Sequence, residues 1–293
     1  MRLYLLPLIL LIATMQVIAQ PSARKSASKR KGNTSQFDKF LEKQWWIGLK
    51  AGINMAEALP TARYAVLTPT NYNPSLTDKT YDGFRKMGSQ ATFEVTFYVK
   101  GISFSLQPTY RHNRFTYENN FEWENPENSV ERLVLKYEQE QKVGYADLPL
   151  IIKYDIAGNK LRPYVQGGVF YSLLVSANKS VEITGTDFGS GGTNEFSSQP
   201  VVVGAKDLFH TSYWGLLAGA GLNYNQGNVR FIFDASYRLG MSNITHTQNR
   251  FNNDRLSGIG DAQDDMKLNN LVFSFGCLFP LRFLSSSFKA LDR

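Results

Sequence analysis

The sequence predicts an all-β fold: an eight-stranded antiparallel transmembrane β-barrel with short periplasmic turns and long extracellular loops. Three observations lead to this prediction. Eight segments alternate apolar and polar residues with a period of two, which is the spacing of a β-strand. The connections between these segments alternate between short and long, as they do in transmembrane barrels. Charged residues share one face of the strands, and the other face is apolar.

The composition agrees with many strands and narrows the function. The 293 residues include 15 Tyr, 20 Phe and 23 Gly, a mixture that suits strands and tight turns. The formal net charge of +7 is compatible with a nucleic-acid binder. The basic residues do not gather in a folded patch, however, and no known reader motif is present. We therefore expect no nucleic-acid partner.

The N-terminal segment has the features of an export signal. Residues 1–19 are a short apolar run that predicts a signal peptide cleaved near Ala19, with a retained signal anchor as the alternative. Residues 20–44 are Ser-, Lys- and Arg-rich and are expected to form a flexible periplasmic tail; contact with anionic lipid, cell wall or a partner is the alternative. Cys277 is the only cysteine, so we expect neither a lipidated N-terminal cysteine nor an internal disulfide.

The predicted barrel domain spans residues 45–284 and leaves a C-terminal tail at 285–293. Its first strand begins at Trp45, where the odd positions through Ile53 are apolar and Lys50 lies on the opposite face. Three hairpins and a last strand follow. The expected strands are 91–100, 102–111, 145–156, 162–176, 213–225, 228–242 and 268–283.

Two of the hairpin turns are short enough to predict a register. Lys100-Gly101 provides glycine where a positive φ is needed, and Gln226-Gly227 is expected to close the third hairpin. In both registers apolar residues face apolar residues, as correct pairing requires. The expected pairs are Val99 with Ile102, Phe97 with Phe104, Glu94 with Gln107, Leu222 with Phe231, Ala220 with Phe233 and Ala218 with Ala235.

Four connections are long and polar, and they are expected to be surface loops on one side of the membrane. They cover residues 55–88, 118–144, 179–212 and 243–267, although part of 131–143 could extend its neighbouring strand. An even number of strands places both termini on the side of the short turns.

The charged face is predicted to line the lumen, and the apolar face is predicted to contact outer-membrane lipid. A lipid-facing Lys or Arg at mid-depth costs about 2–4 kcal/mol, so the charges belong inside a membrane barrel. A soluble barrel with an apolar interior is the alternative. The residues that share this charged face are Lys50, Glu94, Asp147, Lys153, Asp155, Arg230, Asp234 and Arg238, with four of each sign.

Small residues are expected to leave room for these long side chains to cross the lumen. The predicted third hairpin places Gly215, Gly219 and Gly221 opposite Arg238, Asp234 and Ile232. Asp234 is expected to be the partner of Arg230 and Arg238, so that Asp234→Leu would lower the unfolding temperature. A lumen packed with paired charges would not conduct well.

Aromatic residues of the apolar face gather near the ends of the strands. Such rings mark the two membrane interfaces in transmembrane barrels. The expected interfacial aromatics are Trp45, Tyr154, Tyr224 and Phe279 on the side of the short turns, and Tyr110, Tyr171, Trp214 and Tyr237 on the other side.

Three segments resemble a known family. Gly48–Asn54 (GLKAGIN), Tyr145–Tyr154 (YADLPLIIKY) and Arg162–Gly168 (RPYVQGG) are similar to the PorT-type outer-membrane β-barrel family of Bacteroidetes-like bacteria, and the likeness runs from about Trp46 to Phe283. The resemblance implies an eight-stranded barrel in the bacterial outer membrane. It also implies that some members serve type IX protein secretion and gliding, whereas most have no assigned activity.

Catalytic chemistry finds little support in the sequence. His112, His210 and His246 fall near the long loops, where Asp207 or Glu118 could be a partner, but no nucleophile-elbow or metal spacing accompanies them. We expect solvated histidines. A lipid or peptide hydrolase acting at the rim is the alternative.

Three other loop features have ordinary explanations. The aspartates of the last loop match no known calcium-binding spacing, so solvation is expected for Asp254, Asp261, Asp264 and Asp265. Residues 189–194 (GSGGTN) precede no predicted helix and are read as a linker. Tyr117, Phe121 and Trp123 belong either to a contact patch or to a hairpin extension above the membrane.

The sequence therefore predicts a non-enzymatic envelope protein without cofactor or metal, whose loops and rim bind an envelope protein partner. An accessory role in a type IX-like secretion or surface assembly is the specific form of this expectation. A narrow channel or small-ligand receptor is a further alternative.

Overall fold

Eight long strands close into a ring in the computed structural model, which describes residues 43–64, 79–156, 160–189 and 192–281. The predicted signal peptide, the C-terminal tail and residues 20–42 lie outside these residues. Lys43 and Gln44, predicted as tail, instead begin the first strand. Among the described residues, no helix has the length and apolar composition needed to cross a membrane.

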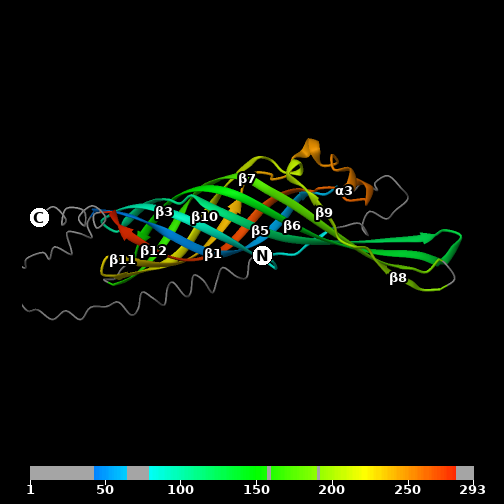
Figure 1. Cartoon of the computed structure of the whole chain (residues 1–293), viewed down its shortest axis with the longest axis horizontal. Helices are drawn as coiled ribbons and strands as arrows, with labels where there is room; N and C mark the ends of the chain where they lie inside the picture. The colour runs from blue at the N-terminus through cyan, green and yellow to red at the C-terminus, as the bar shows by residue number, and fades with distance from the viewer. Residues whose placement is uncertain (1–42, 65–78, 157–159, 190–191, 282–293) are drawn as a thin grey trace, which may run out of the picture. The chain divides into compact units, whose positions relative to one another are not determined.

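The ring is built from consecutive antiparallel neighbours (Figure 1). Strand β1 pairs with β3 on one side and with β12 on the other, which closes the sheet. The ring strands are β1 (Lys43–Ala62), β3 (Met87–Val99), β4 (Ile102–Leu106) with β5 (Thr109–Asn125), β6 (Asn128–Asp155), β7 (Leu161–Asp187), β10 (Ser212–Gln226), β11 (Val229–Gly240) and β12 (Asp265–Pro280). The predicted fold class is confirmed.

Strands β4 and β5 form one barrel strand with an interruption at Gln107 and Pro108. Proline has no N–H to donate to the ladder, so regular pairing stops there. The register is unchanged across the gap, because β3 pairs Val95 with Leu106 before it and Thr92 with Thr109 after it.

The first predicted turn is confirmed. Val99 pairs with Ile102 and Phe97 with Phe104. Lys100 has a φ of 46° and Gly101 a φ of 92°, so both turn residues adopt the left-handed conformation that a tight hairpin requires.

The predicted register of the third hairpin is wrong by two residues. Leu222 pairs with Phe233 and Gly221 with Asp234, whereas Arg238 lies opposite Leu217. The turn consists of Gly227 and Asn228, because β10 extends to Gln226, which pairs with Val229. Gly227 has a φ of 59° and takes the first turn position. A shift of two keeps every side chain on its predicted face.

The second predicted loop is wrong in a more informative way. Residues 118–144, expected as loop, are almost entirely strand, since β5 and β6 remain paired from Thr109 and Asp147 out to Asn125 and Asn128. Strand β7 continues beside β6 as far as Asp187. These strands run on past the ring as a projecting sheet (Figure 1).

Short elements complete the side of the long connections. Strand β2 (Thr80–Tyr81) pairs with β5, and β8 (Asn194–Ser197) and β9 (Val201–Gly204) pair with β7. Two 3-10 turns, η2 (Lys206–Leu208) and η3 (Thr247–Asn249), and one short helix, α3 (Asp254–Gly258), lie in the last two connections.

Candidate functional site: the filled lumen and the mouth of the barrel

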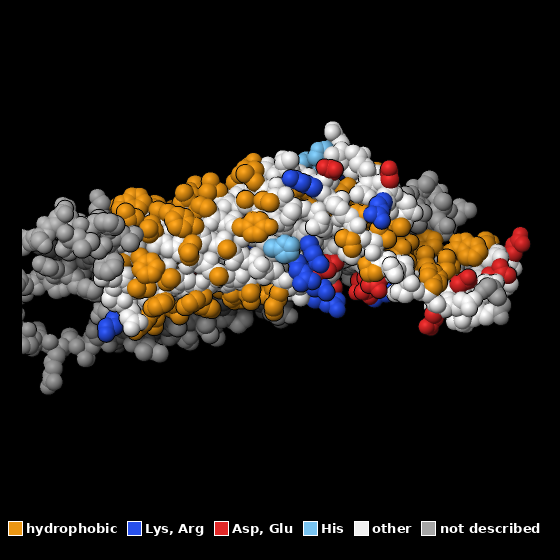
Figure 2. All heavy atoms as spheres, in the orientation of Figure 1, with side chains coloured by type: hydrophobic (Ala, Val, Ile, Leu, Met, Phe, Trp, Pro, Cys, Tyr) orange, Lys and Arg blue, Asp and Glu red, His pale blue; other side chains and the backbone are white. Residues whose placement is uncertain are grey.

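The outer face of the ring is apolar and ends at exposed aromatic residues. Figure 2 shows hydrophobic side chains covering the ring strands, with Lys, Arg, Asp and Glu gathered beyond them. All eight predicted interfacial aromatics are exposed, from Phe279 at 39% to Tyr154 at 55%. We treat the strand segments between the two aromatic sets as the membrane-spanning part, and the side of Tyr110, Tyr171 and Trp214 as the mouth.

Glu94 of β3 is the centre of a buried ion-pair layer inside the ring. Its carboxylate lies 3.0 Å from the ammonium of Lys50 and 2.6 Å from that of Lys153. Lys50 also lies 3.1 Å from Asp234, which accepts a hydrogen bond from the Tyr164 hydroxyl. These side chains come from β1, β3, β6, β7 and β11, so the layer ties separate strands together across the lumen.

A second layer surrounds Asp147, nearer the mouth. Its carboxylate lies 2.8 Å from Arg238 and 3.1 Å from Arg111, and Arg111 donates a hydrogen bond of 2.7 Å to the hydroxyl of Tyr213. Arg111 also belongs to the charged face, although it is not among the eight predicted residues. The strand pattern 102–111 does place it there, so parity could have found it. With Arg162, which shares this face on β7, the face carries six cations against four carboxylates.

Arg230 has a different environment from the one predicted. Its guanidinium lies 4.2 Å from the ring centre of Trp46 and donates a hydrogen bond of 2.8 Å to Asn225, and no ion pair to it is found among the described residues. Asp155 instead lies 3.6 Å from Arg162. The expectation that Asp234 is the partner of Arg230 and Arg238 is wrong, because Asp234 pairs with Lys50 and Arg238 with Asp147.

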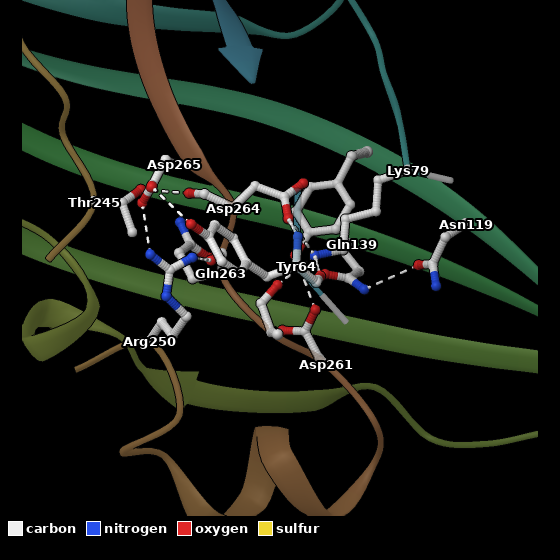
Figure 3. A network of polar contacts seen from close by, with 12 residues as sticks. Tyr64, Lys79, Asn119, Gln139, Thr245, Arg250, Asp261, Gln263, Asp264 and Asp265 are labelled. Atoms are coloured by element: carbon white, nitrogen blue, oxygen red, sulfur yellow. Dashed lines mark hydrogen bonds and ion pairs between the residues drawn. The ribbon is translucent and has the colours of Figure 1, made fainter. Parts of the chain in front are cut away.

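A second polar cluster, the mouth cluster, lies beyond the membrane-spanning segments (Figure 3). It joins the last connection to segments that are distant in sequence. Lys79 donates to Asp264 at 2.9 Å and to the carbonyl of Ala262, and Arg250 lies 2.9 Å from Asp265. Its members are Tyr64, Lys79, Tyr81, Tyr117, Lys179, Thr245, Arg250, Asp261, Gln263, Asp264 and Asp265.

Lys179 of β7 is the most deeply enclosed cation of the mouth cluster. Its side chain is completely buried, pairs with Asp261 and donates to the hydroxyl of Tyr117. Burial lowers the pKa of Lys179, and the attraction of Asp261 offsets only part of this effect. Burial and then the charge of Asp261 raise the pKa of Tyr117 well above its usual value. The phenol is therefore held neutral as a donor to Asp261.

Apolar side chains of the last two connections pack beside the mouth cluster. Leu208, Ile244 and Leu256 are buried in one core with strand residues such as Phe115 and Met266. The chain between β11 and β12 thus folds onto the ring instead of forming a solvated loop. Paired ions and a hydrophobic core together close this end of the lumen.

The predicted aspartate group does not converge. Asp261, Asp264 and Asp265 each contact a different cation, and Asp254 lies in the first turn of α3. Within the part of the chain that the structure describes, no three His, Cys, Asp or Glu side chains are placed to hold a metal ion. The expectation of simple solvation is wrong for Asp261 and Asp264, which are 4% and 0% exposed.

The three histidines occupy two separate places. His210 and His246 lie together, with ring centres 5.1 Å apart, because the Phe209–Thr245 bridge joins their segments. His112 lies on the outer face of β5, next along the strand from Tyr110 on that face. The structure therefore does not bring the three side chains to one site.

The predicted aromatic patch is divided along the projecting sheet. Tyr117 belongs to the mouth cluster, Phe121 is buried, and Trp123 is 40% exposed farther out on β5. Of the GSGGTN segment, Asn194 begins β8, so the segment connects two strands of the projecting sheet.

Comparisons with known proteins give one family and several remote structural likenesses. The chain is similar to Neisserial surface protein A of Neisseria, with 14% identity over 80% of this chain and 96% of that chain, at a TM-score of 0.31. It is similar to Ail, the attachment invasion locus protein of Yersinia pestis, with 12% identity over 80% of this chain and 99% of that chain, at a TM-score of 0.30. It is also similar to outer membrane protein W of E. coli, with 14% identity over 82% of this chain and 98% of that chain, at a TM-score of 0.33.

Among curated proteins, no relative matches the sequence. A family model described as "Outer membrane protein beta-barrel domain" matches residues 19–246, which is most of the chain. Together with the closed ring and its apolar outer face, this match shows that the chain belongs to the outer membrane protein beta-barrel domain family.

Proposed function

We propose that this protein is a non-enzymatic component of the bacterial outer membrane whose projecting sheet binds another envelope protein. The observation that carries the proposal is the extension of β5, β6 and β7 far beyond the ring, with β8 added at its edge. A barrel that served only as a membrane anchor would not need an ordered sheet of this length outside the membrane.

The two faces of the projecting sheet differ in character. Cross-strand pairs place Phe121 beside Leu135 and Trp123 beside Leu133 on one face, and Phe196 of β8 lies beside Gly185 on the same face. The other face carries charged side chains such as Glu122 and Lys136. Trp123 and Phe196 are 40% and 45% exposed. Exposed aromatics on a rigid sheet are the side chains that most often dominate protein interfaces.

The closed lumen supports a binding role over transport. Two ion-pair layers and the mouth cluster fill the path through the ring with side chains from several strands. The separation of His112 from His210 and His246 supports a non-enzymatic role, without a bound cofactor. In finer terms, we propose membership of the PorT-type group and an accessory part in a type IX-like secretion or surface assembly, after export by a cleaved signal peptide. We propose that its partner is a protein and not a nucleic acid.

Cross-linking in living cells tests this proposal. Trp123→Ser with Phe196→Ser should reduce cross-linking to one defined envelope protein and lower the amount of exported surface protein. The matched control is Glu122→Ser with Glu195→Ser, which removes two side chains from the opposite face of the same strands. Unchanged cross-linking in the aromatic variant, or equal losses in both variants, would contradict the proposal. Loss of a hydrolytic activity in His210→Ala with His246→Ala would favour an enzyme instead.

A further inference from the structure

The outer face of β5 and β6 changes from apolar to basic at the membrane boundary. On β6 the outward residues of the membrane-spanning part are Leu150 and Leu148, and on β5 the outward Tyr110 is 49% exposed. The first charged side chains beyond them are Arg114 and Lys142, which are directly opposite each other across the strand pair. Figure 2 shows this order on one face, with hydrophobic side chains, then His, then Lys and Arg.

Like charges in directly opposed positions destabilise a strand pair unless a counter-ion lies between them. Here one carboxylate serves both cations. Glu140 accepts two hydrogen bonds from Arg114, at 2.8 and 2.6 Å, and lies 3.5 Å from Lys142. The three groups therefore leave one positive charge unbalanced, and Arg114 and Lys142 remain 36% and 44% exposed.

His112 lies close to these two positive charges. It lies on the same outer face, between Tyr110 and Arg114. Burial, followed by the charges of Arg114 and Lys142, lowers the pKa of His112, and the opposing effect of Glu140 is smaller. The imidazole therefore lies beside two cations, and its N–H can donate a hydrogen bond to an anion between them.

The backbone of these cations lies just beyond the headgroup layer of the membrane, and their long side chains can reach into it. Four residues of strand from Tyr110 to Arg114 span about 13 Å, and a tilt near 45° reduces this to about 9 Å along the membrane normal. Long basic side chains reach back several ångströms toward the interface. The headgroup region itself is roughly 5–7 Å thick. The guanidinium and ammonium therefore lie within reach of lipid phosphates.

We propose that His112, Arg114 and Lys142 form a binding site for the phosphate of an anionic outer-leaflet lipid, whose acyl chains pack on the apolar strand surface below. The phosphate lies between the guanidinium and the ammonium, which are its charge-assisted donors, and the imidazole donates from the membrane side. Glu140 holds the two cations in position and competes with the phosphate for them.

Because Glu140 competes with the phosphate for the two cations, removing its charge should strengthen lipid binding, and this can be tested. Barrels are placed in phosphatidylcholine nanodiscs containing diphosphoryl lipid A, and bound lipid is counted by native mass spectrometry. Arg114→Gln with Lys142→Gln should weaken lipid A binding by about thirtyfold, because each cation near the surface contributes a factor of about five. Glu140→Gln should strengthen binding, since it removes the competing carboxylate. The control variant Arg132→Gln with Lys136→Gln removes two cations of β6 that lie farther from the membrane. It should bind lipid A as tightly as the native chain does.

Further arms separate the possible sources of phosphate. Raising the salt concentration should weaken binding to the native chain more than binding to the double variant. Free inorganic phosphate at millimolar concentration should not displace the lipid, because it lacks the acyl contacts. Equal binding by the double variant and the control, or weaker binding by Glu140→Gln, would overturn the proposal. The retention of the native gel mobility without heating shows that each variant is folded.

Discussion

Single buried carboxylates hold the interior of this barrel together, and Glu94 has the largest share. It pairs with Lys50 and Lys153 and accepts a hydrogen bond of 2.6 Å from Thr96. Glu94→Gln keeps the shape of the side chain but removes the charge that both ammonium groups need. Breaking a buried pair in this way costs about 3–5 kcal/mol. Urea unfolding in lipid vesicles, followed by tryptophan fluorescence, measures the loss.

A neutral contact of the same strand provides the control for Glu94. Thr92 shares a hydrogen bond of 2.8 Å with Thr109, inside the same lumen. Thr92→Val removes this bond between uncharged groups and should cost only about 1 kcal/mol. Similar losses in the two variants would show that the ion pairs have no special role.

Tyr117 makes the stability of the mouth sensitive to alkali. Its pKa is raised well above 10, first by burial and then by Asp261, whereas in the unfolded chain it titrates near 10. Both states keep this proton below pH 10, so Tyr117 adds no pH dependence to stability there. Above pH 10 the unfolded chain loses the proton first, and stability falls as the pH rises. Tyr117→Phe should flatten this fall, measured as the unfolding temperature against pH. An identical slope in both proteins would contradict the assignment.

At the scale of residues, the sequence predicts which face a side chain occupies better than which partner it meets. The period of two is a property of the strand backbone, so it places Lys50, Glu94 and Asp234 on one face without further information. Partners depend on register and on curvature across the lumen, so the expected pairing of Asp234 with Arg238 fails. The contacts of Lys79 could not be predicted, because it lies outside any periodic segment.

Among the elements, the turn between β3 and β4 places the strictest requirement on backbone conformation, because both of its residues have a positive φ. Gly101 has a φ of 92° and has no neighbouring heavy atom within 4 Å of the position that a Cβ would take. Gly101→Ala should therefore cost about 1 kcal/mol through backbone strain alone. Gly204→Ala is the matched control, because a Cβ there also meets nothing within 4 Å and the φ is ordinary. Thermal unfolding of both variants distinguishes strain from crowding, and equal midpoints would refute the strain argument.

The projecting part of β5 and β6 shows why loop predictions fail for paired strands outside a membrane. Residues 118–144 carry many polar side chains, and apolar residues such as Phe121, Trp123 and Leu135 alternate with charged ones only over short stretches. They form strands because each satisfies the backbone of the other and because the ion pair of Lys136 with Glu118 joins the two strands. Neither cause is visible in a hydropathy pattern.

This hairpin is expected to be separable from the ring. The mouth cluster ends at Tyr117, well before the turn between Asn125 and Asn128. Replacing residues 122–134 by Asn-Gly joins Phe121 to Leu135, which are directly paired, through a favourable two-residue turn. The shortened protein should keep its unfolding temperature within a few degrees and should lose partner cross-linking. A barrel that no longer folds would show that the projecting sheet is part of the folding unit.

For the molecule as a whole, the strand count and the closed ring follow from the sequence because they depend on patterns repeated in every hairpin. The number of alternating segments and the strict order of short and long connections leave few other topologies. The closed mouth does not follow from them. It depends on Ile244, Leu256 and Met266 finding a core with side chains that are distant in the sequence, and such contacts carry no local signature.

Two independent closures lead to an expectation about conduction. The two layers around Glu94 and Asp147 lie within the membrane-spanning part, and the mouth cluster with its apolar core lies beyond them. Ions would have to pass both. The native chain should therefore show no steady conductance in planar bilayers, and neither closure should open the path when it is removed alone.

A pair of changes and their combination test this expectation. Replacing residues 249–264 by a short Gly-Ser linker removes α3, Arg250, Asp261 and Asp264, which opens the mouth but leaves the inner layers intact. Replacing Glu94, Lys153, Asp147 and Arg238 by Ala removes one ion pair from each inner layer but leaves the mouth closed. Only the combined variant should conduct. Discrete conductance in the native chain, or in the linker variant alone, would show that the ion-pair layers do not seal the lumen and would favour a channel.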